Sequence, residues 1–246
     1  MQTEVRLTDD GSCTLYVPEI DECYHSIHGA VQESMHVSIT AGFLKYVSLN
    51  RQDNISEPKM DEDGLETVCS ELRRINVLEI GFGTGLNAYL TLLEAERLKI
   101  HVCYTALELY PLPAVEALKL NYPEILFTKR GLFEKIHLLP WEDEQAVSPY
   151  FTLCKEQVDF TGHELKDSYD VIYFDAFSPE KQPEMWYENR FYMIYKHSGE
   201  NAVLTTYCAK GVVRRAMLSA GFVVERLQGP PGKREMLRGR RLIIDN

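Results

Sequence analysis

Short apolar runs alternate with segments of helical periodicity along most of the chain. Nearly every residue of the apolar runs is hydrophobic, as in buried strands, whereas the segments between them repeat apolar residues every three or four positions. Strands separated by helices predict βαβ units and a mainly parallel, doubly wound α/β sheet. The expected strands are Ile75–Ile80, His101–Leu109, Tyr169–Phe177, Ala202–Tyr207, Phe222–Leu227 and Leu242–Ile244. The expected helices are Leu86–Leu98, Ala114–Asn121 and Val212–Ala220.

Three regions have a weaker pattern. Residues 1–50 contain short alternating stretches, such as Cys13–Val17, and then the denser mixed stretch Tyr24–Leu49, which indicates a β-rich N-terminal extension that runs into helix. The polar segment Asn50–Gly64 contains proline and glycine and is expected to be a loop. In Pro123–Ser168 only broken short elements can be distinguished.

Length and composition fit one folded unit. A chain of 246 residues that is 45% hydrophobic can bury one sizeable core. We expect residues 1–64 to form an extension that packs on a main domain, 65–246. The polar N-terminus lacks an apolar segment of signal-peptide or membrane length, so a cytoplasmic protein without membrane contact is expected. The six cysteines show no CxxC pair and no Cys/His cluster, so reduced thiols and no metal site are expected.

Charge is distributed unevenly along the chain. The net charge of −11 argues against a surface coated with positive potential for nonspecific nucleic-acid binding. From Lys210 to Asn246, however, nine basic residues stand against three acidic ones. Phosphate contacts need only a local cluster of lysine and arginine, so this end suits an enzyme that touches a polyanion at one place. A solvated basic face is the alternative reading of the same charges.

Three glycines stand at alternate positions between a predicted strand and a predicted helix. Gly81, Gly83 and Gly85 permit positive φ and the close approach of a ligand to the backbone. A dinucleotide fingerprint, G-x-G-x-x-G, would require glycine at position 86, which is leucine, so a dehydrogenase is disfavoured. The spacing G-x-G-x-G resembles the first motif of S-adenosylmethionine-dependent methyltransferases. That resemblance predicts a loop that meets the amino-acid part of the cofactor.

Polar residues near the glycine loop complete the predicted cofactor site. Glu108 ends the next predicted strand, where a carboxylate can accept hydrogen bonds from both ribose hydroxyls, although an exposed strand-end acid has the same sequence signature. Asp159 could hydrogen-bond an adenine amino group in the same crevice. Glu79 and Asn87 flank the loop and are included among the cofactor-binding candidates.

Asp175 ends a strongly apolar predicted strand, which places a carboxylate at the floor of the crevice. It could hold a nucleophile in line with a reactive methyl group or receive its proton, or it could be a helix N-cap or a structural acid. Trp186, in the proline-rich segment that follows, is either a pocket wall or the anchor of the next helix. Aromatic residues that could desolvate an amine are Tyr173, Phe174, Phe177, Trp186 and Tyr207.

Five motifs in order carry a more specific likeness. The chain resembles the tRNA 5-aminomethyl-2-thiouridine methyltransferase family, which comprises MnmD and the N-terminal methyltransferase half of MnmC. The likeness covers most of the chain. The motifs are DGSCTLYVPEIDECYHSIHGAVQES from Asp10, LEIGFGTGLNA from Leu78, DVIYFDAFSPEKQPEMW from Asp170, TYCAKGVVRR from Thr206 and GPPGKREM from Gly229.

The resemblance implies a Rossmann-like class I S-adenosylmethionine-dependent methyltransferase. It implies methyl transfer to the amine of a 5-aminomethyl group on the wobble uridine, position 34, of certain tRNAs, which gives 5-methylaminomethyl-(2-thio)uridine. Asp175 and Phe177 would contact the reacting nucleotide. MnmC also carries a flavin-dependent half, for which this chain has no room, so no flavin is expected. The residues expected to contact tRNA are Lys181, Lys210, Arg214, Arg215, Lys233 and Arg234.

Two competing functions remain at this stage. The chain could be a methyltransferase or aminopropyltransferase that acts on a small amine, or it could be a noncatalytic cofactor-binding partner of another tRNA-modification enzyme. The basic C-terminal segment and the family motifs favour a tRNA anticodon loop as the partner. No permanent protein partner is evident from the sequence.

Overall fold

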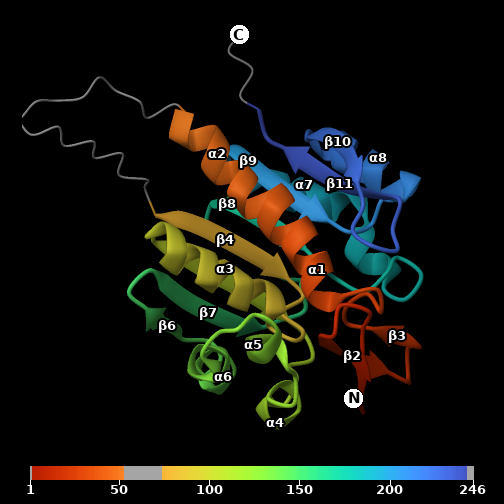
Figure 1. The fold of residues 1–246 in the computed structure, drawn as a ribbon. Coiled ribbons are helices and arrows are strands. Elements are labelled where there is room, and N and C mark those ends of the chain that lie inside the picture. The colour runs from red at the N-terminus through yellow and green to blue at the C-terminus, as the bar shows by residue number, and fades with distance from the viewer. Residues whose placement is uncertain (1, 53–73, 243–246) are drawn as a thin grey trace, which may run out of the picture.

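A twisted eight-stranded sheet forms the centre of the molecule (Figure 1). The computed structural model describes residues 2–52 and 74–242. In spatial order the strands are β10 (Val223–Gln228), β11 (Glu235–Arg240), β9 (Ser198–Thr206), β8 (Tyr169–Phe174), β4 (Ile75–Ile80), β5 (Val102–Glu108), β7 (Phe151–Gln157) and β6 (Glu144–Ser148). The five central strands, from β9 to β7, run parallel to one another. At one end of the sheet β6 is antiparallel to β7, and toward the other end β11 is antiparallel to both β9 and β10.

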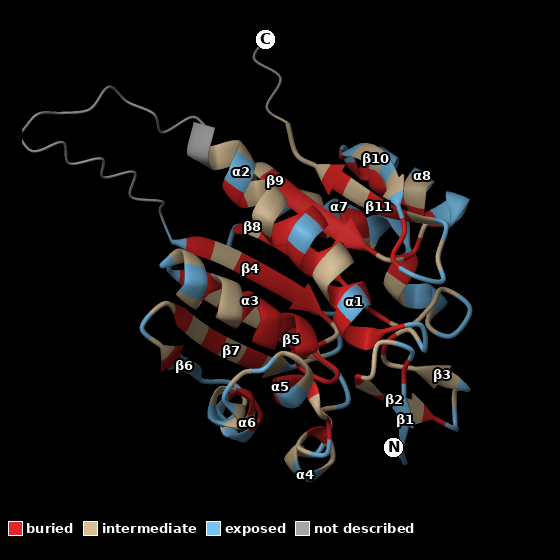
Figure 2. Ribbon diagram, in the orientation of Figure 1, coloured by how far each residue is buried: buried red, intermediate tan, exposed pale blue. Residues whose placement is uncertain are grey.

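Both faces of the sheet are covered, which explains the nearly continuous apolar runs of its central strands (Figure 2). On β4, Val77 joins the core on one face, whereas Leu78 and Ile80 join the core on the other. The first face carries α3 (Leu86–Leu98) and α6 (Arg130–Leu138), and the second carries α7 (Glu188–Lys196) and α8 (Gly211–Ala220). The predicted α/β class is therefore confirmed.

The N-terminal segment forms a small sheet and then a long helical region. The strands β1 (Glu4–Leu7), β2 (Cys13–Val17) and β3 (Glu22–Cys23) pair antiparallel beside one end of the main sheet (Figure 1). The helical region consists of α1 (Ala30–Ser34), the π-helical segment η1 (Met35–Phe43) and α2 (Leu44–Gln52). Ile39 and Phe43 of η1 are fully buried in the core of the first face. The segment thus packs directly on the central sheet.

Several predicted boundaries were wrong or lie outside the described residues. Asn50 lies in α2 and not in a loop, while most of the predicted loop Asn50–Gly64, with the proposed domain boundary after residue 64, lies outside the described residues. Leu242 belongs to no strand, and Ile244 also lies outside them. The helix expected at Ala114–Asn121 is helical only over α4 (Ala114–Ala117), and a second short helix, α5 (Tyr122–Ile125), begins just after the predicted range.

The region between Pro123 and Ser168 contains a helix and two strands that its sequence did not reveal. The strand β7 pairs with β5 over its full length, so it is a core element of the sheet. Its inward positions are Phe151, Leu153 and Lys155, and the lysine interrupts the expected apolar pattern. Lys155 is 1% exposed, donates to the His137 carbonyl at 3.2 Å and lies 5.0 Å from the Trp141 ring centroid. Burial lowers the pKa of this lysine to about 8.

Candidate active site

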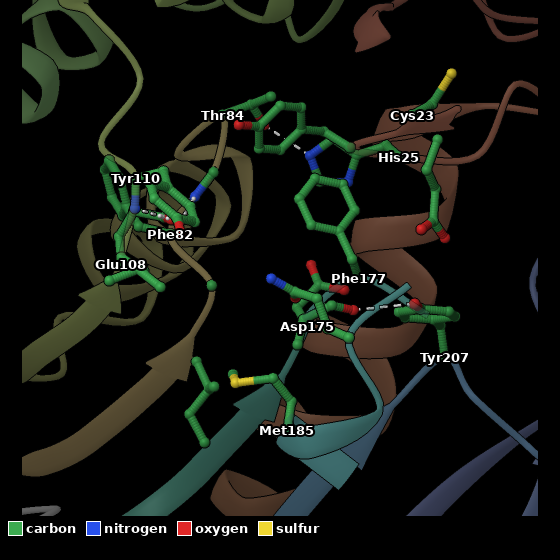
Figure 3. A pocket seen from close by; sticks show the side chains of 18 of the residues that line it. Cys23, His25, Phe82, Thr84, Glu108, Tyr110, Asp175, Phe177, Met185 and Tyr207 are labelled. Atoms are coloured by element: carbon green, nitrogen blue, oxygen red, sulfur yellow. Dashed lines mark hydrogen bonds between the residues drawn. The ribbon is translucent and has the colours of Figure 1, made fainter. Parts of the chain in front are cut away.

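A cavity of 490 Å³ opens where the carboxyl ends of β4, β5 and β8 meet the N-terminal segment. Its volume falls in the range of small-molecule sites, roughly 300–1,000 Å³. One part is lined by the glycine loop, Glu108 and Asp159, and another part by Asp175, Phe177 and Tyr207 (Figure 3). Ligands of doubly wound sheets bind at this edge, so the cavity is the candidate active site.

The glycine loop passes between β8 and the N-terminal segment with no room for side chains. Gly81 has φ of +94°, and a Cβ atom there would lie 2.7 Å from the Asp175 carbonyl oxygen. Gly83 has φ of +48°, and its Cβ would lie 2.7 Å from Cδ1 of Tyr24. Both the conformation and the packing therefore require glycine. Gly81 and Gly83 line the cavity, and contact between this loop and a cofactor stays a prediction.

Glu108 fixes the glycine loop from the neighbouring strand. Its carboxylate accepts hydrogen bonds from the backbone N–H groups of Gly83 at 3.0 Å and of Tyr110 at 2.9 Å. These two bonds hold the end of β5 against the loop. The carboxylate also lines the cavity, so it can face a ligand while it anchors the loop.

Asn87 joins two carboxylates beneath the loop. Its Nδ2 donates to Oε1 of Glu79 at 2.9 Å and to Oδ2 of Asp175 at 2.8 Å. Burial raises the pKa of Glu79 well above its usual value. Burial, reinforced by the charge of Glu33, raises the pKa of Asp175 to about 7. Glu79 is 1% exposed and is absent from the cavity lining, so it supports the site from below through Asn87.

Asp159 lies on the loop after β7 and lines the same cavity. It is exposed, and Oδ1 accepts from the backbone N–H of Thr161 at 2.8 Å and from its hydroxyl at 2.6 Å. The Thr161 hydrogen bonds lower the pKa of this carboxyl. The adjacent Phe160 is buried and forms part of the wall, a contribution that the sequence analysis did not identify.

Aromatic rings enclose the part of the cavity around Asp175 (Figure 3). Phe177 lies 5.2 Å from the Tyr24 ring, and Tyr207 donates from its hydroxyl to the Ala176 carbonyl at 3.0 Å. Trp186 is buried and donates from Nε1 to the Phe177 carbonyl at 2.9 Å, so it anchors the segment and does not line the cavity. The expectation that Tyr173 and Phe174 form pocket walls was wrong, because these rings pack in the cores of the sheet, and for Trp186 the anchor reading holds and the wall reading does not.

The N-terminal segment supplies cavity residues that the sequence analysis did not identify. His25 lies beside the glycine loop, with Nε2 2.6 Å from Oγ1 of Thr84, and burial lowers its pKa to about 4. Glu33 on α1 is 7% exposed and also lines the cavity. The motif Asp10–Ser34 was the available signal, because it contains both His25 and Glu33.

The predicted tRNA-contacting residues occupy different environments. Lys233 lines the cavity and pairs with Glu33, while Lys210 pairs with Glu180 at the surface. The side chains of Lys181, Arg215 and Arg234 are exposed and Arg214 is half-buried. Other basic residues near the C-terminus are internally paired, namely Arg226 with Glu235 and Arg238 and Arg240 with Glu225. Fewer cations of the C-terminal segment are therefore available to contact phosphates than its composition suggests.

Within residues 2–52 and 74–242, no group of three or more His, Cys, Asp or Glu side chains is arranged to hold a metal ion. Within the same residues, no helix has the length and apolar character needed to cross a membrane.

Comparison with known proteins identifies the family. The family described as S-adenosyl-L-methionine-dependent methyltransferase matches residues 150–241. The tRNA 5-methylaminomethyl-2-thiouridine biosynthesis bifunctional protein MnmC of Legionella pneumophila is 28% identical over 249 residues, which cover 90% of this chain and 34% of the relative. The protein of the same name from Polaromonas naphthalenivorans is 31% identical over 253 residues, 97% of this chain and 36% of the relative. The chain spans about a third of the length of these relatives.

Solved structures support the fold. The crystal structure of MNMC2 from Aquifex aeolicus superposes with a TM-score of 0.69 at 23% identity, and covers 97% of this chain and 70% of that one. Spermidine synthase from Thermotoga maritima gives a TM-score of 0.50 at 13% identity, with 98% and 71% covered. The predicted Rossmann-like methyltransferase fold is confirmed.

The cavity residues fit S-adenosylmethionine, the cofactor of this family. The glycine loop exposes backbone at a point where a Cβ atom would meet Asp175 or Tyr24. Glu108 and Asp159 both line the cavity, and their carboxylate oxygens can accept hydrogen bonds there. A cavity with these groups suits a ligand that carries an amino acid, a ribose and an adenine.

Proposed function

We propose, given that this chain belongs to the S-adenosyl-L-methionine-dependent methyltransferases and is related to the MnmC proteins, that it methylates a tRNA wobble uridine. The acceptor would be the primary amine of a 5-aminomethyl group on (2-thio)uridine, and the product the 5-methylaminomethyl derivative. The observation that carries the proposal is the half-buried Asp175 carboxylate, which lies among aromatic cavity residues directly beside the glycine loop.

The acceptor amine must be neutral when it reacts. A primary alkylamine similar to lysine has a pKa near ~10.4 in water, so little of it is neutral at pH 7. When bound, the cofactor supplies an electrophilic methyl group on a sulfonium. Tyr24, Phe177 and Tyr207 exclude water around the acceptor, and this desolvation favours the neutral amine.

Asp175 is proposed to position the amine. Asn87 already donates to Oδ2, so Oδ1 can accept an N–H of the substrate and direct its lone pair toward the cofactor part of the cavity. A carboxylate alone would favour the ammonium form, which opposes the effect of the aromatic pocket. Because burial raises the pKa of Asp175 to about 7, this carboxyl is partly protonated at neutral pH, whereas an exposed aspartate is almost fully ionised.

The decisive experiment is methyl transfer from labelled S-adenosylmethionine to tRNA that carries aminomethyluridine, followed by mass spectrometry of the nucleosides. A parallel reaction uses tRNA with carboxymethylaminomethyluridine. We expect 5-methylaminomethyluridine from the first substrate alone. No product from either tRNA, with cofactor binding intact, would favour a small-amine methyltransferase or a noncatalytic cofactor-binding protein.

Glu108→Ala is expected to weaken the binding of S-adenosylmethionine by about tenfold to hundredfold. The substitution removes the acceptor for the Gly83 N–H and a carboxylate that faces the cavity, and hydrogen bonds to charged groups contribute roughly 1.5–3 kcal/mol each. Isothermal titration calorimetry measures the change. Glu116→Ala, which removes a half-buried surface carboxylate of α4 that does not line the cavity, is the control and should bind the cofactor normally.

The pH dependence of kcat/KM is expected to show an inflection near pH 7. Asp175 accepts the substrate N–H best when ionised, so the rate should fall as the pH drops through its pKa of about 7. Deprotonation of the amine gives a further rise at higher pH in every variant. The pH profile of kcat/KM for Asp175→Asn, measured from pH 6 to 9, should lack the inflection near pH 7. Its persistence in that variant would assign it to another group.

Exposed cations of the C-terminal segment are proposed to contact the phosphates of the anticodon arm. Arg215→Gln and Arg234→Gln should each make the slope of log association constant against log salt concentration shallower by about one. The reason is that tRNA binding to either variant releases one counterion fewer from the phosphates. Filter binding at several salt concentrations measures the slope. Lys99→Asn, at the far end of α3, is the control. Unchanged slopes in both arginine variants would exclude this surface from tRNA binding.

A further inference from the structure

An ion pair joins two distant parts of the chain inside the cavity. Nζ of Lys233, in the turn before β11, lies 2.5 Å from Oε1 of Glu33 on α1. The other oxygen, Oε2, accepts from the backbone N–H of Ser26 at 2.7 Å. The side chain of Glu33 is only 9% exposed, and that of Lys233 is 31% exposed. Both residues line the cavity, so their remaining hydrogen-bonding capacity faces the site.

The pair is held in one orientation close to Asp175. Nζ of Lys233 lies 3.9 Å from the centroid of the Tyr207 ring, which is itself fixed by its hydrogen bond to the Ala176 carbonyl. The charge of Glu33 raises the pKa of Asp175 and that of Lys233 lowers it, which places both charges near the acceptor end of the cavity. The aromatic walls at this end come from Tyr24 and Phe177.

Glu33 and Lys233 present adjacent groups of opposite hydrogen-bonding character. A carboxylate only accepts hydrogen bonds and an ammonium only donates them. The edge of uracil next to C5 has the complementary order, because O4 is an acceptor and N3–H is a donor. Cytosine has the reverse order, with an amino donor at C4 and an acceptor at N3.

We propose that Glu33 and Lys233 read the uracil edge of the methyl acceptor, with Lys233 donating to O4 and Glu33 accepting from N3–H. This inference rests on the proposed function, since it places the C5 substituent of the same base beside Asp175. The base then lies between the aromatic rings, as is usual for a nucleotide removed from its stack. A phosphate contact by Lys233 is disfavoured, because the paired carboxylate of Glu33 would repel the anion.

The wild-type protein provides the first test. Anticodon stem-loops would carry 5-aminomethyluridine, its N3-methyl derivative or 5-aminomethylcytidine at the wobble position, and kcat/KM would be measured for each. We expect the second and third to be used at least about a hundredfold less well, because each leaves a buried group of the pair without its partner. Equal use of the three substrates would overturn the inference but leave the proposed function intact. Inactivity on 5-aminomethyluridine itself would overturn both.

The variant Glu33→Gln provides the second test. Glutamine can donate to N3 of cytosine, so we expect the preference for the uridine over the cytidine substrate to shrink by about tenfold or more. A purely structural role for Glu33 would lower both rates by the same factor and leave the preference unchanged, which would overturn the inference. Glu116→Gln, which removes the surface ion pair with Lys119, is the matched control and should keep the wild-type preference. If Glu33→Gln does not bind the cofactor, the comparison of the three stem-loop substrates with the wild-type protein alone decides whether the inference holds.

Discussion

Asp175→Asn is expected to lower turnover at saturating tRNA and cofactor by about a hundredfold, the lower end of what a positioned acid or base contributes. The amide oxygen can still accept from Asn87, so the loop and the affinity for S-adenosylmethionine should change little. The amide nitrogen, however, presents hydrogen atoms where the substrate amine needs an acceptor. Single-turnover measurements separate this loss in the chemical step from changes in tRNA binding.

The same variant should be more stable than the wild type at alkaline pH. The pKa of Asp175 is raised from 3.8 to about 7 in the folded protein, so the unfolded chain ionises first and the fold loses stability as the pH rises from 3.8 to about 7. Such an elevation corresponds to roughly 4 kcal/mol at most, and asparagine removes it. Thermal unfolding at pH 5 and pH 8 should show a gain at both values that is clearly larger at pH 8.

A matched control lies on the same strand. Asp170, at the other end of β8, is also a largely buried carboxyl whose pKa burial raises, and it accepts from the Asn76 N–H at 2.8 Å and the Tyr46 hydroxyl at 2.9 Å. Asp170→Asn should leave turnover unchanged. Nearly wild-type turnover in Asp175→Asn would exclude a catalytic role for that carboxylate.

Gly81→Ala is expected to weaken the binding of S-adenosylmethionine by at least about a hundredfold. The φ of +94° is strained for alanine by roughly 1–3 kcal/mol, and the new Cβ would lie 2.7 Å from a backbone oxygen that cannot move without moving Asp175. The loop and the acceptor carboxylate would therefore shift together. Calorimetry would record the lost affinity, and turnover should fall with it.

Gly131→Ala separates this effect from the general consequences of replacing glycine. Gly131 lies in α6, and a Cβ there would meet no atom within 4 Å. Alanine should stabilise the helix by up to about 1 kcal/mol and leave cofactor affinity unchanged. Normal binding by Gly81→Ala would show that the cofactor does not rest on this loop.

The sequence alone determined the central βαβ units and the glycine loop with Glu108 that lines one part of the cavity. Buried parallel strands require continuous apolar runs, so Ile75–Ile80 and the strand that leads to Asp175 were evident. Gly81 and Gly83 were evident because a loop with positive φ that closely contacts neighbouring groups tolerates no Cβ. Glu108 followed from its place at the end of the next strand. These features depend on residues that are neighbours in the chain.

The tertiary structure alone decided which distant residues complete the site and which charges are free. Lys155 obscured β7, because only its surroundings, a carbonyl and an aromatic ring, make a buried lysine tolerable. The strand β11 was missed because Arg238 reads as a solvated charge until Glu225 of β10 lies opposite it. Glu33 and Lys233 meet across 200 residues of sequence. Pairing between such residues depends on how the elements pack, and no local pattern records that.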